Sequence, residues 1–300
     1  MTVETLTDAT AAGFPPIVLA FSAADPSGGT GVQADVLTLA SMGCHPLSVV
    51  TALSVQDTLA VEGMQPVDSE WVADQARCLL EDMPVDAFKI GALGNVENVA
   101  AVAEVLSDYP EVPLILDPVL ASGRGEEFAS DEMVHAMTEL LLPQTTVLIV
   151  NSLEIRRLAE TDDDDDDPSL AGCAAALVEA GCEYVLVTGT HEPSRDIVNT
   201  LYGKSGVVRT DNWSRLPGSF HGAGATLAAA VTAMIANGLD VPEAVREAQD
   251  YTWHALKKAY RPGMGRFLPD RLFWARDDNE ARSDSPADVP VPRADARGSH

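Results

Sequence analysis

Six short runs of apolar residues limit the possible folds of this chain more than any other feature. They cover residues 17–21, 47–53, 88–93, 114–120, 147–150 and 184–187. Several of the runs are apolar at consecutive positions instead of alternate ones. That pattern is typical of strands buried on both faces, as in a parallel sheet that helices cover on each side.

Amphipathic stretches separate the apolar runs and have the spacing of helices. They cover residues 31–42, 69–80, 96–106, 130–141 and 170–179. Gly43 suits the end of the first, because glycine readily takes the left-handed conformation that closes a helix. Strands alternating with helices predict an α/β fold with a mostly parallel central sheet and helices on both faces.

The last third of the chain predicts a different pattern. A hairpin is expected from residues 197–202 and 207–211, followed by helices at 224–236 and 242–260. We interpret residues 15–274 as one domain.

The two ends of the chain lie outside that predicted domain. Residues 1–14 are interpreted as a flexible N-terminus. Residues 275–300 are polar and proline-rich, with little apolar surface to bury, which predicts a disordered tail. The six aspartates at 162–167 predict a solvated loop, since consecutive residues cannot all converge on one metal ion.

The composition restricts the partners. The net charge is −27, from 46 acidic and 19 basic residues. Such a surface repels nucleic acid and anionic membranes, so neither is expected as a partner. An anionic ligand would therefore need local positive potential from helix N-termini, backbone amides, Mg²⁺ or a few well-placed bases.

No apolar run reaches the roughly 18–20 residues of a membrane span. The first 14 residues lack the basic head of a secretory signal, and the four cysteines form no CxxC pair. We therefore expect a soluble, cytoplasmic protein.

A glycine-rich segment, Gly218-Ser-Phe-His-Gly-Ala-Gly-Ala-Thr-Leu227, precedes an alanine-rich predicted helix. Its glycines let a ligand approach the backbone closely, and the first amides of a helix have no intrahelical acceptor. The segment is thus a candidate anion site, although an ordinary loop-to-helix turn could have the same residues.

A second glycine-rich loop, Asp25-Pro-Ser-Gly-Gly-Thr-Gly31, joins the first predicted strand to the first helix. Ligands bind beyond the carboxyl ends of strands in open α/β sheets. The loop lacks the GxGxxG pattern and the GKS or GKT ending of a P-loop, which disfavours a dinucleotide fold and a Walker-type nucleotidase.

Polar residues also follow two later strands. Asp117 ends one, and Asn151 and Glu154 follow another. Each alone is more often a cap or turn residue, but at one rim of a parallel sheet the carboxylates could hold Mg²⁺ directly or through water.

These elements together resemble the bacterial hydroxymethylpyrimidine/phosphomethylpyrimidine kinases of the ribokinase-like superfamily, over residues 17–272. The resemblance rests on DPSGGTG with VQAD after it, VTALSVQDT, KIG, DPV, NxxE, GTH and HGAGATLAAA in the family's order, and on GMGRF at the end.

The resemblance implies an enzyme that uses ATP and Mg²⁺ to phosphorylate 4-amino-5-hydroxymethyl-2-methylpyrimidine and then its monophosphate, for thiamine biosynthesis, and a possible homodimer. It implies substrate-binding roles for Gln56, Asp25, Gly28, Gly29 and Val119. The nucleotide would contact Asn151, Glu154, Thr188 and Gly189, with Asp117 and Glu154 organising the metal. The transferred phosphoryl group would meet Gly222, Ala223, Gly224 and Ala225, with His221 and Asp35 as candidate proton relays.

Four positions depart from the family. Ala225 stands where most members have Cys and other ribokinase-like enzymes have an Asp base, and Thr188 replaces a common lysine. Ala23 and Ala92 replace a glycine and a methionine near the pocket. The alternatives are therefore a pyridoxal kinase, or a pseudokinase that binds pyrimidine or nucleotide without turnover. An active kinase remains the preferred hypothesis, because positioning and charge stabilisation carry most of phosphoryl transfer. Without the base it could be slow, or Asp35, His221 or water could relay the proton.

Overall fold

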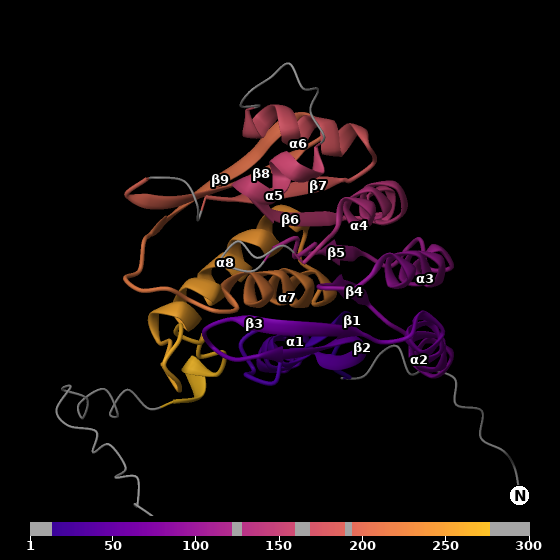
Figure 1. Ribbon diagram of the computed structural model, residues 1–300. Coiled ribbons are helices and arrows are strands. Elements are labelled where there is room, and N and C mark those ends of the chain that lie inside the picture. The colour runs from indigo at the N-terminus through magenta and orange to yellow at the C-terminus, as the bar shows by residue number, and fades with distance from the viewer. Residues whose placement is uncertain (1–13, 122–127, 160–168, 190–193, 277–300) are drawn as a thin grey trace, which may run out of the picture.

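The computed structural model describes residues 14–121, 128–159, 169–189 and 194–276. These residues build a nine-stranded sheet in the order β3-β2-β1-β4-β5-β6-β7-β8-β9 (Figure 1). The parallel strands are β1 Ile17–Ala24, β2 His45–Gln56, β4 Ala87–Ile90, β5 Leu114–Leu116, β6 Val147–Asn151 and β7 Tyr184–Thr188.

Antiparallel strands close both edges of the sheet. β3 (Val61–Pro66) pairs with β2, and the hairpin of β8 (Asp196–Gly203) and β9 (Gly206–Ser214) pairs with β7. The chain runs from β1 outward to β2 and then returns to the other side of β1 at β4. This reversal makes the carboxyl ends of β1 and β4 a topological switch point, where open α/β sheets bind ligands.

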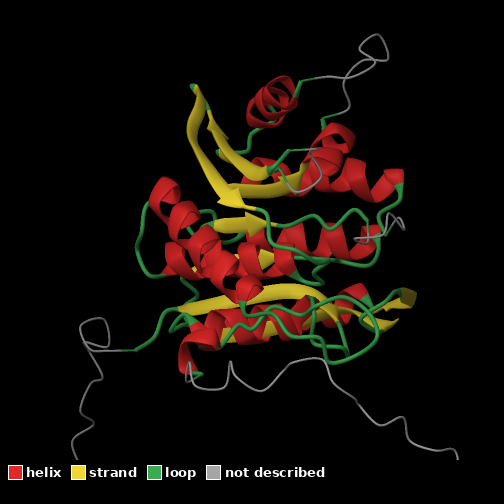
Figure 2. Ribbon diagram, turned by 90° about the vertical axis from the view of Figure 1, so that its left-hand side faces the viewer, coloured by secondary structure: helices red, strands yellow, loops and turns green. Residues whose placement is uncertain are grey.

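Helices cover both faces, as the sequence predicted (Figure 2). One layer consists of α1 Gly31–Ser41, α7 Ala223–Ala236 and α8 Val241–Lys257. The other consists of α2 Ser69–Asp82, α3 Val96–Ser107, α4 Asp131–Ala136, α5 Ser152–Leu158 and α6 Leu170–Glu179.

Alternate residues of one strand enter different cores. Leu148 and Val150 of β6 pack in the core under α2 to α6, whereas Val147 and Ile149 pack in the core under α7 and α8. Burial on both faces explains why the strand is apolar at every position. The predicted α/β fold with a mostly parallel sheet is confirmed.

The predicted elements are found, but five differ from the prediction. The edge strand β3 and the short helix α5 were missed. The strands predicted at 88–93 and 114–120 end at Ile90 and Leu116. The helix predicted at 130–141 is α-helical only to Ala136, then forms a π-helical turn, Met137–Leu141.

The predicted domain of residues 15–274 stays a prediction, although the described elements reach a final 3₁₀ turn at Phe273–Ala275. The predicted N-terminal extension and tail, and the aspartate run at 162–167, lie almost wholly outside the described residues. No helix within the described ranges is long and apolar enough to cross a membrane.

Candidate functional site

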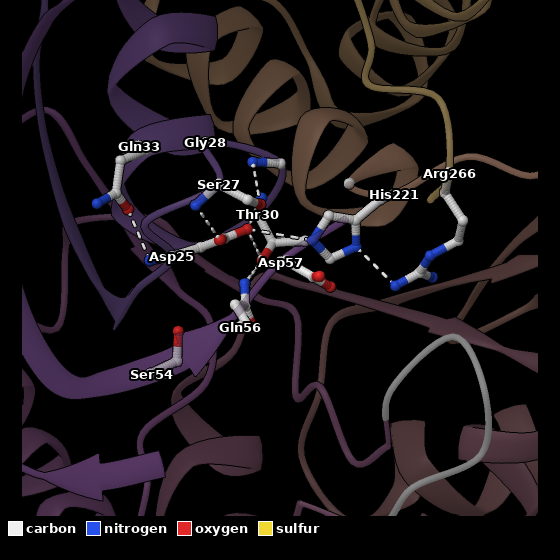
Figure 3. A network of polar contacts seen from close by, with 12 residues as sticks. Asp25, Ser27, Gly28, Thr30, Gln33, Ser54, Gln56, Asp57, His221 and Arg266 are labelled. Atoms are coloured by element: carbon white, nitrogen blue, oxygen red, sulfur yellow. Dashed lines mark hydrogen bonds and ion pairs between the residues drawn. The ribbon is translucent and has the colours of Figure 1, made fainter. Parts of the chain in front are cut away.

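Asp25 organises the loop that follows β1. Its Oδ1 accepts the N–H of Ser27 at 2.8 Å, and its Oδ2 accepts the N–H and the hydroxyl of Thr30 at 2.7 and 2.9 Å (Figure 3). Only 2% of Asp25 is exposed. The carboxylate thus replaces water as the acceptor for the loop and holds the segment in one conformation at the switch point.

The Asp25 carboxylate also contacts His221 from the second glycine loop, across 3.1 Å between Oδ2 and Nε2. Burial alone would raise the pKa of Asp25, but hydrogen bonds from His221, Gln56, Ser27 and Thr30 hold it well below its usual range. The carboxylate is therefore charged at neutral pH, and His221 fastens the two loops together (Figure 3).

The geometry around His221 sets its tautomer. Nη2 of Arg266 lies 2.9 Å from Nδ1 of His221. A guanidinium can only donate, so Nδ1 accepts and Nε2 carries the proton that is donated to Asp25. Both ring nitrogens are occupied, which leaves His221 no lone pair with which to relay a substrate proton in this arrangement.

Close contact between the two loops requires glycine in each. A Cβ on Gly29 would lie 2.1 Å from Cδ2 of His221, and a Cβ on Gly222 would lie 1.7 Å from the backbone oxygen of Gly29. Gly222 also has a φ of +95°, a left-handed conformation. The predicted glycine motifs are thus two halves of one surface.

Helix α7 begins at this surface. Gly222 is its N-cap and has no side chain to satisfy the first amides, those of Ala223, Gly224 and Ala225. Gly224 is exposed and Ala225 half-buried. Free amides at the positive end of a 14-residue helix are suited to bind a phosphate oxygen.

Two carboxylates lie farther along the rim, after β5 and in α5. Burial, together with the charge of Asp35, raises the pKa of Asp117 to about 6. Burial and the charge of Asp117 raise the pKa of Glu154 to about 7. A buried carboxylate next to a half-buried one whose charge it disfavours forms a site that a cation would stabilise.

The predicted NxxE motif is a capping box. Oδ1 of Asn151 accepts from the amides of Leu153 and Glu154 at 2.9 and 3.0 Å, and Oε2 of Glu154 accepts from the amide of Asn151 at 3.0 Å. The cap and the predicted nucleotide contact are compatible, because capping uses the amide oxygen of Asn151 and leaves its Nδ2 to donate elsewhere.

The carboxylate pair suits Mg²⁺, which takes oxygen ligands and commonly binds through one or two carboxylates plus substrate phosphates. Asp117 and Glu154 supply two carboxylates of this kind, and substrate phosphates would supply further oxygen ligands.

Lys89 of β4 lies between Asp35 of α1 and Asp117 at the rim of the sheet. No functional role was predicted for it. Its Nζ lies 3.1 Å from Oδ1 of Asp35 and 4.0 Å from Oδ2 of Asp117. Lys89 and Asp35 are fully buried, with exposures of 1% and 0%. Burial raises the pKa of Asp35, and the charge of Lys89 opposes that rise. The sequence does contain one indication of a special role: Lys89 is the single charged residue in the otherwise apolar, buried strand AFKI.

The other predicted residues lie around this rim. Val119 has a φ of +43°, a conformation that is strained for a β-branched residue. Thr188 lies opposite Asn151 in the β6–β7 register. The amide of Gly189 donates to Oδ1 of Asn199 at 3.0 Å, which anchors the end of β7 to β8.

Gln56 lies at the end of β2, beside the first glycine loop. Its Nε2 donates to the hydroxyl of Thr30 at 3.3 Å. It also lines a cavity of about 340 Å³, together with Ser27, Thr58 and Met264. The cavity is large enough for a single heteroaromatic ring, and Oε1 of Gln56 can accept from such a ring.

The fold has counterparts among solved kinases. The pyridoxal kinase from Staphylococcus aureus in complex with AMP-PCP and pyridoxal is 25% identical, with a TM-score of 0.77, and the match covers 88% of this chain and 96% of that chain. The phosphomethylpyrimidine kinase from Clostridium difficile is 26% identical with a TM-score of 0.70, over 80% and 99%. The protein is thus a small-molecule kinase with a ribokinase-like fold.

The family model described as phosphomethylpyrimidine kinase matches residues 25–270. The chain belongs to this family. It is 36% identical over 265 residues to the hydroxymethylpyrimidine/phosphomethylpyrimidine kinase of Mycobacterium leprae, a match that covers 86% of this chain and 95% of the relative. The family resemblance seen in the sequence is confirmed.

The raised pKa values of Asp117 and Glu154 predict a pH dependence. Because folding favours their protonated forms, the stability they contribute is full below about pH 4 and is lost as the pH rises through about 6 and about 7. The melting temperature of the ligand-free protein should therefore fall from about pH 5 to about pH 8. Thermal unfolding at several pH values tests this; a constant or rising melting temperature would contradict it.

Proposed function

We propose that this protein transfers the γ-phosphoryl group of ATP to 4-amino-5-hydroxymethyl-2-methylpyrimidine and then to its monophosphate. One observation carries the proposal: two glycine loops meet at the switch point of the sheet beside the free first amides of α7, and the carboxylates of Asp117 and Glu154 lie farther along the same rim. The name of the Mycobacterium leprae relative supports both steps, and Mg²⁺ is part of the proposal.

Different residues would bind the phosphates and orient the acceptor. The amides of Ala223, Gly224 and Ala225 would hold the transferred phosphoryl group, and Gln56 would orient the pyrimidine beside the Asp25 loop. Asp117 and Glu154 would hold Mg²⁺, which when bound neutralises phosphate charge. Asn151 would donate to the phosphates through Nδ2.

Proton removal is left to solvent in this proposal. The acceptor oxygen forms a bond to the γ-phosphorus, the bond to the β-phosphate bridging oxygen breaks, ADP leaves, and the hydroxyl proton goes to water. Ala225 cannot accept a proton, His221 has both nitrogens occupied, and Asp35 is buried against Lys89. Catalysis would then depend on positioning and charge, giving a slow enzyme.

Incubation with ATP and Mg²⁺ tests the proposal, with product masses measured for three acceptors. The pyrimidine alcohol should gain one phosphate, its monophosphate should gain a second, and pyridoxal should react more slowly. Faster transfer to pyridoxal would favour the pyridoxal kinase alternative, which the Staphylococcus aureus likeness supports. Binding of both substrates without any transfer would favour a pseudokinase.

Glu154→Gln should weaken Mg²⁺-dependent turnover by about tenfold or more, because a carboxylate charge beside the polyphosphate is lost. The fold should survive, since Gln can still accept from the amide of Asn151. Turnover measured across a magnesium titration, with the exposed Glu104→Gln as control, tests the assignment. Unchanged kinetics would remove Glu154 from the site.

The same variant separates carboxylate titration from general repulsion among the surface charges. It removes one of the two raised pKa values, so its melting temperature should fall less between about pH 5 and about pH 8 than that of the wild type. Equal decreases in the melting temperatures of the variant and the wild type would show that the surface charge, and not the pair of Asp117 and Glu154, sets the pH dependence.

We also infer a cytoplasmic location, where ATP is available, and a homodimer, which the family resemblance implies. The size of the particle in solution, measured by light scattering, tests the homodimer.

A further inference from the structure

Arg271 contacts both glycine loops. Its Nη1 and Nη2 donate to the backbone oxygens of Gly28 and Gly29 at 3.1 and 2.6 Å, and its Nε donates to the hydroxyl of Thr226 in the first turn of α7 at 3.1 Å. One guanidinium thus joins the Asp25 loop to the start of α7.

The backbone of Arg271 is also fixed. Its carbonyl oxygen accepts from the hydroxyls of Ser41 at the end of α1 and Tyr251 in α8, at 2.6 and 2.7 Å. Only 5% of Arg271 is exposed. The planar guanidinium and the backbone carbonyl of Arg271 are both fixed by hydrogen bonds, so the residue is a rigid support for the two loops.

The charge of Arg271 is not matched by a contacting carboxylate. All three of its side-chain acceptors are neutral oxygens, and no Asp or Glu in the described ranges forms an ion pair with it. Asp35 and Asp25 act on it only at longer range. Asp35 is already paired with Lys89, and Asp25 with its own loop and His221.

This charge lies beside the positive end of α7. A Cβ on Gly222, the N-cap, would be 2.9 Å from Nη2 of Arg271. A buried guanidinium next to the positive end of a helix is unfavourable until an anion neutralises both. In a chain with a net charge of −27, such a placement supplies local positive potential that the surface cannot.

We propose that Arg271 is a positioning residue of the phosphoryl-transfer site, which clamps the glycine loops and adds a buried positive charge behind the amides of α7. The inference rests on the proposed function and deepens it. The charge favours the terminal phosphate of a nucleoside triphosphate, the group that would lie at these amides, more than the two phosphates of a diphosphate.

Equilibrium binding of AMP-PCP and ADP to the full chain, measured by calorimetry, tests this without requiring turnover. Arg271→Gln keeps an amide donor for the loop carbonyls and removes the charge, while Arg271→Lys keeps the charge and loses the fork. The preference for AMP-PCP over ADP should fall roughly tenfold in Arg271→Gln and be largely retained in Arg271→Lys. Arg276→Gln, which removes an exposed arginine paired with Asp270, is the matched control and should leave the preference unchanged.

If Arg271→Gln lowers the melting temperature but leaves the preference for AMP-PCP over ADP unchanged, the charge of Arg271 does not act on the phosphate and the residue only stabilises the fold. Equal losses in the Gln and Lys variants would overturn the charge role too. If Arg271→Gln does not fold, Arg271→Lys still tests the charge role: a preference for AMP-PCP that falls roughly tenfold although the charge is kept overturns the proposal. A wild type that binds AMP-PCP no better than ADP also contradicts it, whereas binding of both without phosphate transfer contradicts only the proposed function.

Discussion

Gly222→Ala is expected to destabilise the protein by about 3 kcal/mol or more and to abolish the candidate phosphate site. Two costs add at this position. Alanine is strained at a φ of +95°, at a cost of about 1–3 kcal/mol. Its Cβ would also lie 1.7 Å from the backbone oxygen of Gly29, which cannot move aside as a side chain can. The loops must therefore separate, and the contact between His221 and Asp25 would be lost with them.

The other end of the same helix offers a matched control. Gly238 follows α7 with a φ of +91°, but nothing lies within 4 Å of a Cβ built there. Gly238→Ala should therefore cost only the conformational strain, about 1–3 kcal/mol, without the added cost of separating the loops. Chemical denaturation of both variants gives the difference. Equal losses would show that the two loops do not need their close contact.

Much of the fold could be predicted because burial on both faces leaves a signature in the sequence. The predicted ends of β4 and β5 were wrong for a related reason. Leu93 and Leu120 lie beyond these strands yet remain in the same core, so they extend the apolar runs without extending the strands. The backbone turns away at Gly91 and Asp117, where the functional residues lie. Strand β3 was missed because an edge strand with partly exposed residues needs no apolar run.

The site residues differed in how far the sequence could reveal them. Asp25, Gly222 and Glu154 stand in local motifs, and the structure gives each a local reason to be there: hydrogen bonds for the two carboxylates and a left-handed backbone for the glycine. The roles proposed for them remain predictions. Arg271 has no local signal, because its acceptors at Gly28 and Gly29 are 243 and 242 residues away in the chain. Long-range contacts to backbone oxygens leave no pattern in a single sequence.

Ala225→Cys is expected to raise turnover on the pyrimidine alcohol, by up to the ~10²–10⁴-fold that a positioned base gives. Ala225 is in the first turn of α7, where the positive end of the helix favours a thiolate over a thiol. The family resemblance places a cysteine here, so the half-buried pocket should accept one added sulfur. Substrate affinity should change little, because the thiolate would act on the proton and not on the ring or the phosphates.

The comparison needs controls for size and for thiol chemistry. Ala225→Ser adds a similar volume without a thiolate and should gain much less. Ala236→Cys places a thiol at the opposite end of α7, where the dipole disfavours its ionisation, and should gain nothing. Cys78 is exposed, so all variants are best compared in a Cys78→Ser background when thiol reagents are used.

The pH profile then decides how the gain arises. Turnover of Ala225→Cys should rise with pH and level off below about pH 8.5, the value for an unperturbed thiol, if a lowered pKa supplies the base. A gain of less than about threefold would mean that the proton already leaves by another route. If wild type and Ala225→Cys both bind ATP and pyrimidine but neither transfers phosphate, the missing base is not the reason, and a pseudokinase becomes the better description of this chain.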